Sequence, residues 1–143
     1  CRSPAAEAIF INLLKKKGLA DGFIVDSAGT GSWHIGKKSD SRMRIAAERR
    51  GITILSRSRQ ITSQDFVKFN YILAMDNSNF RDINDLKSRT SASDFGSIRK
   101  IQDFRSVYKD QEVPDPYFGG DEGFDHVLDI LEDSVSGLLE SIS

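Results

Sequence analysis

Apolar residues recur with a helical period at both ends of the chain. One set, which begins just after Pro4, falls on a single helix face: Ala6, Ile9, Phe10, Leu13 and Leu14. This spacing predicts a helix that starts at Ser3 as N-cap and ends at Gly18 in a left-handed conformation. Residues 124–142 show the same period over a longer run, which predicts a long amphipathic terminal helix.

Shorter helices are predicted between these two. Residues 40–50 form a helical pattern closed by Gly51, and another helix is expected over residues 78–86. Thr62 and Asp65 have the spacing of a capping box, which predicts a short helix at that point.

Continuous apolar runs separate these helices. We predict buried strands at "FIVDSA" (residues 23–28) and "YILAM" (residues 71–75), and a further strand over residues 98–104. Helices that alternate with short apolar strands predict an α/β domain: a doubly wound parallel sheet with helices on both faces, in three layers. A chain of this kind that opens on a helix predicts a strand and a loop ahead of Cys1. We therefore expect residues 23–27 and 71–75 to flank a gap or a strand supplied from upstream, and not to pair with each other.

Composition narrows the class of protein. The 143 residues match one domain, and a net charge of −1 gives no reason to expect nucleic acid or a membrane as partner. One cysteine and two histidines leave no framework for disulfides or structural zinc. We expect a cytoplasmic monomer without cofactor or metal.

Chemistry-bearing residues lie where elements begin and end. Arg2 sits at a predicted helix start, where unpaired amides attract anions, although an arginine near a chain end is more often simply solvated. Asp115 is held between Pro114 and Pro116, and the adjacent aromatic residues favour a desolvated carboxylate over an ordinary exposed one.

These stretches resemble a known family. "CRSPAAEAIF" is similar to the second half of the phosphate loop, C-x-x-x-x-x-R-[ST], of the low-molecular-weight protein tyrosine phosphatases. "VDSAGTGSWHIG", "RQITSQDF", "YILAMDNSN" and "DPYFGG" match other signatures of that family in the right order. The resemblance covers essentially the whole chain. It implies one phosphatase domain over residues 1–143, truncated at its N-terminus, with a sheet of four parallel strands of which the first is missing.

The resemblance also implies a reaction. Phosphotyrosine or an aryl phosphate is hydrolysed through a phosphocysteine, and inorganic phosphate is released. Arg2 binds the phosphate oxygens, Ser3 hydrogen-bonds the thiolate, and Asp115 acts first as general acid and then as general base. The family's nucleophile falls upstream of Cys1, which matches a second cysteine able to protect the nucleophile under oxidation. The chain as printed is therefore expected to be inactive.

Further roles follow from the same resemblance. Trp33 faces Tyr117 and Phe118 as walls of an aryl-binding cleft, where the family more often has Tyr at the position of Phe118. Asp26, Ser27 and Asp76 support the phosphate loop. His34 is expected to be structural or solvated, and the pair Asp40 and Arg42 is either a helix start or part of the cleft.

Other functions fit the residues less well. An N-terminal-nucleophile hydrolase would open on a strand, whereas Cys1 leads directly into Pro4 and a helix. Arsenate reductases of this fold need further cysteines, and none follows Cys1. A phosphoarginine phosphatase of the same fold and a non-catalytic anion-binding fragment both remain open alternatives.

Overall fold

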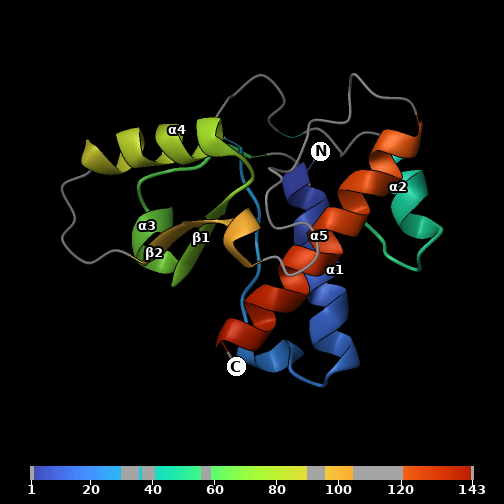
Figure 1. Cartoon of the computed structure of the whole chain (residues 1–143). Coiled ribbons are helices and arrows are strands. Elements are labelled where there is room, and N and C mark those ends of the chain that lie inside the picture. The colour runs from blue at the N-terminus through green and yellow to red at the C-terminus, as the bar shows by residue number, and fades with distance from the viewer. Residues whose placement is uncertain are drawn as a thin grey trace.

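A two-stranded parallel sheet lies between helices in the computed structural model (Figure 1). The structure describes residues 2–29, 36, 41–55, 59–89, 96–104 and 121–142. Within them the elements are α1 (Arg2–Lys16), η1 (Ala20–Gly22), α2 (Ser41–Glu48), α3 (Asp65–Lys68), β1 (Tyr71–Ala74), α4 (Asn77–Ser88), β2 (Ser97–Lys100), η2 (Ile101–Phe104) and α5 (Asp121–Ile142). This arrangement confirms the α/β class with a parallel sheet, although the described residues form only two strands.

The sheet pairs β1 with β2 in a register that sets Tyr71 opposite Ser97 and Ala74 opposite Lys100. Side chains of β1 alternate between two apolar clusters, as the period of a strand requires. Ile72 and Ala74 pack with Phe66 and the α4 residue Ile83. Leu73 and Met75 pack into the larger cluster on the opposite face. The prediction that this strand is covered on both faces is therefore confirmed, except that Tyr71 at its start is 44% exposed.

Helix α5 forms the centre of the larger cluster. It packs against α1, α2 and η2, and Figure 1 shows α5 lying across α1. Its buried apolar side chains share one face: Phe124, Val127, Leu128, Ile130, Leu131, Val135, Leu138 and Leu139. The predicted terminal helix is thus confirmed, and it starts at Asp121 rather than at Phe124.

The helix ends follow the predicted chemistry, with one exception. Gly18 and Gly51 have φ values of 71° and 77°, the left-handed conformation expected of helix C-caps. The amide of Leu19 bonds back to the carbonyl of Leu14 at 2.9 Å, which closes α1. The prediction of Ser3 as N-cap is wrong, because α1 already begins at Arg2 and Ser3 lies inside its first turn.

Residues 23–28 depart from the sequence prediction. They form no strand, and Ile24 is 78% exposed instead of buried. Among the described residues the segment pairs with no strand, and the bridge next to it is an isolated one between Gly29 and Gln60. Without a ladder to occupy, an apolar run remains irregular. As expected, no ladder joins residues 23–28 to β1.

The strand predicted at residues 98–104 is confirmed only in its first part. Strand β2 ends at Lys100, and Ile101–Phe104 turns into the 3₁₀ helix η2. This turn brings the backbone of Phe104 against Gly137 of α5, where a Cβ would overlap the Phe104 carbonyl oxygen. The sheet and the terminal helix therefore meet through a close backbone contact.

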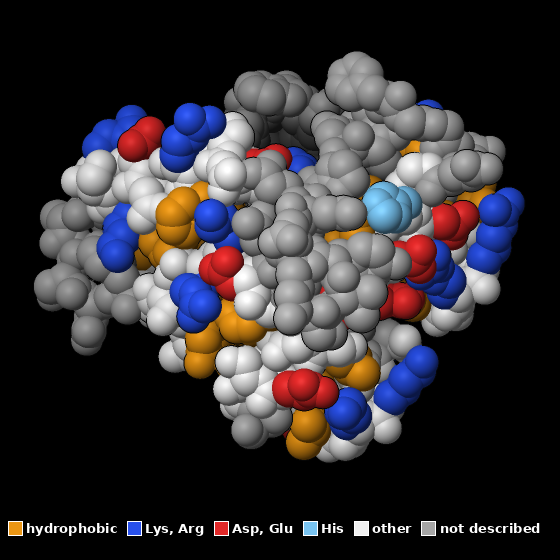
Figure 2. Space-filling model, viewed as in Figure 1, with side chains coloured by type: hydrophobic (Ala, Val, Ile, Leu, Met, Phe, Trp, Pro, Cys, Tyr) orange, Lys and Arg blue, Asp and Glu red, His pale blue; other side chains and the backbone are white. Residues whose placement is uncertain are grey.

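Acidic and basic side chains are interspersed over the visible face of the molecule (Figure 2). This distribution agrees with the near-zero net charge. No helix in the described part of the chain has the length and apolar character that crossing a membrane requires.

Candidate active site

Arg2 is the first residue of α1, and its guanidinium reaches the start of α4. Its Nη1 donates to Oδ2 of Asp76 at 2.8 Å, and its Nη2 lies 3.5 Å from Oδ1 of Asn79. The side chains of Arg2 and Asp76 are only 18% and 19% exposed. This ion pair is therefore more shielded from solvent than a typical surface ion pair. Exposed surface pairs contribute little to stability.

Asp76 lies at the carboxyl end of β1 and is the N-cap of α4. Its Oδ1 accepts the backbone N–H of Asn79 at 2.7 Å. Burial opposes ionisation of this carboxyl, but the hydrogen bonds from the Asn79 backbone and from Arg2 outweigh it and lower its pKa. Asp76 is thus an anionic partner of Arg2, located where ligands bind in open α/β sheets.

The N-terminus of α1 adds a second favourable feature for an anion. The first backbone N–H groups of a helix have no partner within the helix, and the helix dipole favours negative charge there. A guanidinium has five N–H donors in a planar fork, the geometry that matches carboxylate and phosphate oxygens. Arg2 and the first turn of α1 therefore combine two features that favour an anion.

Asp26 and Ser27 form hydrogen bonds with Glu7 and Arg59. The Ser27 hydroxyl donates to Oε1 of Glu7 in α1 at 3.1 Å, and the Ser27 amide donates to Oδ1 of Asp26 at 2.8 Å. The other oxygen of Asp26, Oδ2, accepts a hydrogen bond from Nε of Arg59 at 3.1 Å. These two residues thus connect α1 to Arg59.

Three contacting residues were not predicted as site residues: Glu7, Arg59 and Asn79. Glu7 lies in the quoted stretch "CRSPAAEAIF" and Asn79 ends "YILAMDNSN", so for both the family motif was the available signal. Arg59 opens the family signature "RQITSQDF", so that motif was the available signal for it.

Several predicted site residues lie outside the described residues: Cys1, Trp33, Asp115, Tyr117 and Phe118, together with His34 and Asp40. Arg42, the expected partner of Asp40, lies over the ring of Phe124 with 4.7 Å between Cζ and the ring centroid. Arg42 therefore contributes to the packing of α2 on α5.

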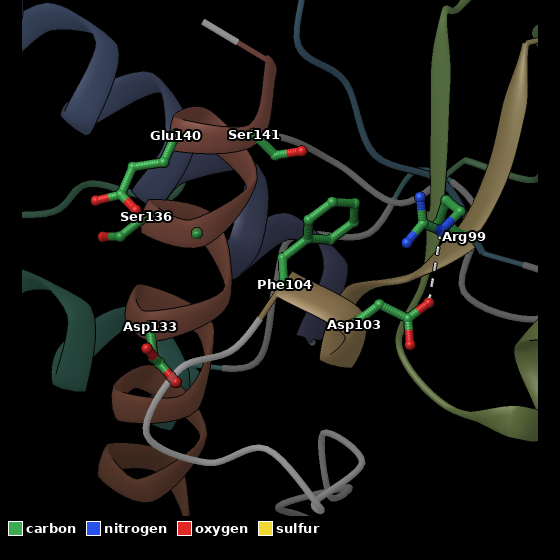
Figure 3. Close-up of a pocket in the computed structure, with 8 residues that line it drawn as sticks. Arg99, Asp103, Phe104, Asp133, Ser136, Glu140 and Ser141 are labelled. Atoms are coloured by element: carbon green, nitrogen blue, oxygen red, sulfur yellow. Dashed lines mark ion pairs between the residues drawn. The ribbon is translucent and has the colours of Figure 1, made fainter.

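A pocket of about 400 Å³ lies elsewhere, between η2 and the C-terminal half of α5 (Figure 3). Arg99 and Asp103 form an ion pair of 3.6 Å at one side, and Ser136 and Glu140 come from α5 at the other. None of its lining residues is a predicted site residue. Among the described residues, no group of histidine, cysteine and acidic side chains is arranged to hold a metal ion.

A parallel α/β sheet with an arginine at a helix start near the strand ends is an arrangement that favours the binding of anions. A family model described as "Low molecular weight phosphotyrosine protein phosphatase" matches residues 1–143. The chain therefore belongs to the low-molecular-weight phosphotyrosine protein phosphatases, which are hydrolases of phosphate monoesters.

Individual relatives agree with this assignment. A low molecular weight phosphotyrosine protein phosphatase of Schizosaccharomyces pombe is 38% identical over 100% of this chain and 90% of its own length. A protein tyrosine phosphatase structure from Entamoeba histolytica shares 43% identity with a TM-score of 0.90, over 99% of this chain and 89% of that one. A Drosophila arginine phosphatase shares 34% identity with a TM-score of 0.92, over 99% and 90%.

Proposed function

We propose that this chain supplies the phosphate ligand and the leaving-group acid for hydrolysis of phosphotyrosine and other aryl phosphates. The observation that carries this proposal is the position of Arg2. It lies at the N-terminus of α1, mostly shielded from solvent, and is oriented by Asp76. A planar guanidinium binds two equatorial oxygens of a phosphate at once, and charge accumulates on those oxygens in the transition state.

Asp115 takes the second role in this proposal. The leaving phenolate needs a proton, and a carboxyl group held between two prolines can be kept in a defined place to supply it. Asp115 then accepts a proton from the water that hydrolyses the phosphocysteine. In this proposal Trp33, Tyr117 and Phe118 provide aromatic surfaces for the aryl ring. The match of these positions to the family motifs supports this role.

The phosphate-binding step can be tested on residues 1–143 directly. Arg2→Lys keeps the charge but loses the two-pronged geometry. We expect it to weaken binding of inorganic phosphate about 10–100-fold, the scale of a lost charged hydrogen bond. Arg81→Lys, at an exposed position of α4, is the matched control and should bind like the wild type. Equal affinities for wild type and Arg2→Lys would remove Arg2 from the proposal.

Turnover needs a second comparison, because the family's nucleophile matches a position ahead of Cys1. We expect residues 1–143 alone not to hydrolyse an aryl phosphate. The same protein preceded by the family's strand and cysteine-containing loop should be active. In that active form, Asp115→Asn should slow hydrolysis by about 10²–10⁴-fold. Activity of residues 1–143 that Cys1→Ser abolishes would overturn the assignment of Cys1.

Phosphoarginine is a second candidate substrate. The similarity to the Drosophila arginine phosphatase, at 34% identity and a TM-score of 0.92, favours it. An assay of the active form with an aryl phosphate and with phosphoarginine, side by side, distinguishes the two. We expect the higher kcat/KM for the aryl phosphate, because the sequence provides aromatic residues in its cleft motifs.

A further inference from the structure

Arg59 lies between two carboxylates from segments far apart in the sequence. Its Nη1 and Nη2 donate to Oδ2 and Oδ1 of Asp65, both at 3.0 Å. Its Nε donates to Oδ2 of Asp26 at 3.1 Å. The guanidinium therefore uses all three of its nitrogens in ionic hydrogen bonds, two of them in the paired geometry that fixes orientation as well as distance.

Asp65 is the buried member of the group formed by Arg59, Asp65 and Asp26. It is the first residue of α3, it is 7% exposed, and its Oδ2 also accepts the backbone N–H of Thr62 at 2.8 Å. A buried carboxylate requires such partners, since an unpaired one would be strongly unfavourable. The Asp65 pair consequently holds the Arg59 guanidinium in one place.

Residues 23–29 are the segment that Arg59 holds in position. Arg59 contacts them twice, because its side chain bonds Asp26 and its carbonyl oxygen accepts the N–H of Gly29 at 2.8 Å. The N–H of Ile61 completes the bridge by donating to the carbonyl of Gly29 at 2.9 Å. Residues 23–28 take part in no ladder of the described sheet. These contacts with Arg59 and Ile61 therefore hold the segment in position, as strand pairing does in a sheet.

From Asp26 the contacts continue to α1. Oδ1 of Asp26 accepts the Ser27 N–H at 2.8 Å, and the Ser27 hydroxyl donates to Oε1 of Glu7 at 3.1 Å. Glu7 belongs to the N-terminal half of α1, the helix that begins with Arg2. A continuous series of hydrogen bonds thus connects buried Asp65 with the helix that carries the phosphate ligand.

We propose that Arg59 is a positioning residue for the phosphate site: through Asp26 and Ser27 it fixes the N-terminal half of α1 and with it the Arg2 guanidinium. This inference rests on the proposed role of Arg2 as phosphate ligand. Lysine cannot replace arginine here, because one ammonium group cannot bond both oxygens of Asp65 and also reach Asp26.

The test compares Arg59→Lys with Arg99→Lys. Arg99 also pairs with an aspartate, Asp103, but its side chain is 50% exposed and lies on the sheet and η2 side of the pocket in Figure 3. Inorganic phosphate is titrated into the chain while the Nε–Hε NMR signal of Arg2 is recorded. Arg59→Lys should move this signal before phosphate is added and weaken phosphate affinity about tenfold, the scale of one lost pairwise coupling. Arg99→Lys should do neither.

A double variant tests the route through Asp26. Asp26→Ala should reproduce most of the loss in affinity, and Asp26→Ala combined with Arg59→Lys should bind no more weakly than Arg59→Lys alone, because both act through one connection. A general loss of stability would instead make the two effects add. Additive losses, or an affinity of Arg59→Lys within about twofold of the wild type, would overturn the proposal.

Failure of the phosphate role itself gives a different result. If neither residues 1–143 nor the form preceded by the family's strand and cysteine-containing loop binds phosphate, the proposed role of Arg2 fails, but the positioning by Arg59 is still measured by two signals without phosphate. Faster amide hydrogen exchange at Ser27 and Gly29 in Arg59→Lys, with a displaced Arg2 signal, supports it. An Arg2 signal that stays in place overturns it.

Discussion

Asp76 binds a different partner with each of its carboxylate oxygens. Oδ1 accepts the Asn79 amide and closes the N-terminus of α4, whereas Oδ2 accepts the Arg2 guanidinium. The first contact needs only an oxygen acceptor, and the second needs a negative charge. Substitution can separate them, because serine caps a helix as well as aspartate but carries no charge.

Asp76→Ala should lower the free energy of unfolding by about 1–2 kcal/mol, the cost of losing a helix cap. Asp76→Ser should keep the cap, so its free energy of unfolding should fall by less. Both variants should displace the Nε–Hε NMR signal of Arg2, because both remove its ionic partner. Urea unfolding measures the first effect and NMR the second. If Asp76→Ser were as unstable as Asp76→Ala, the cap would contribute nothing at this position.

Some residues at element ends could be singled out as candidates from the sequence. Arg2 stands at a predicted helix start, Asp76 follows an apolar strand, and both lie in stretches that resemble family motifs, so each was recognised as a candidate from its neighbours in sequence. Their pairing was not, because it joins residues 74 positions apart and depends on the tertiary structure. Arg59 was missed as an individual residue for the same reason: its contact with Asp26 joins residues 33 positions apart.

At the scale of elements, local capping chemistry was predicted better than strands. Gly18 and Gly51 end helices as expected, because a positive φ is a property of the residue itself. The Asp65 carboxylate accepts the Thr62 amide at 2.8 Å, one of the two contacts of the predicted capping box. The prediction of Thr62 as the cap is wrong, because α3 begins at Asp65 and its N-cap is Gln64, which makes no side-chain cap bond. A strand, in contrast, exists only with a hydrogen-bonded neighbour, so the apolar run at residues 23–28 did not by itself make one.

Gly137 offers a test of how η2 and α5 meet. Replacing a helical glycine with alanine normally stabilises a protein by about 1 kcal/mol. Here the added Cβ would overlap the carbonyl oxygen of Phe104, a backbone atom that cannot rotate away. Gly137→Ala should therefore destabilise the protein by about 1–3 kcal/mol, the usual range for overpacking.

Ser136→Ala is the matched control, one position earlier on an exposed site of α5. It should leave the free energy of unfolding unchanged or raise it by a few tenths of a kcal/mol, because alanine is the better helix former. Thermal or urea unfolding of the two variants measures the difference. A stabilised Gly137→Ala would show that the close approach of Phe104 to α5 is wrong.

At the scale of the whole molecule, β1 connects two apolar clusters. The larger one contains α1, α2 and α5, and the smaller contains α3 and α4 with the opposite face of the sheet. Two ionic contacts also span this layered arrangement: Arg2 with Asp76 and Arg59 with Asp26. The layer order followed from the alternation of helical and apolar segments, whereas the ionic contacts depend on the final packing and were not predictable from that alternation.

Acid should lower the free energy of unfolding through two carboxyl groups, those of Asp65 and Asp76. Burial opposes ionisation of Asp65, but hydrogen bonds from Arg59 and from the Thr62 amide outweigh it, and its pKa is lowered. The pKa of Asp76 is lowered in the same way by the Asn79 amide and Arg2, against the effect of burial. A carboxyl whose pKa is lower in the folded state stabilises the fold at pH values above its unfolded pKa of about 3.9. That contribution disappears as the pH falls from there through the folded pKa.

We therefore expect the free energy of unfolding, measured with urea, to be steady near pH 6 and to fall progressively once the pH drops below about 5. Asp65→Asn should be less stable than the wild type at pH 6, because a neutral amide leaves Arg59 without its buried counter-charge. It should also lose less stability on acidification, since one of the two responsible carboxyl groups is gone. Asp82→Asn, at an exposed position of α4, is the control and should follow the wild-type curve. An Asp65→Asn curve as steep as the wild type's would mean that the Arg59–Asp65 pair does not contribute to the acid sensitivity of the fold.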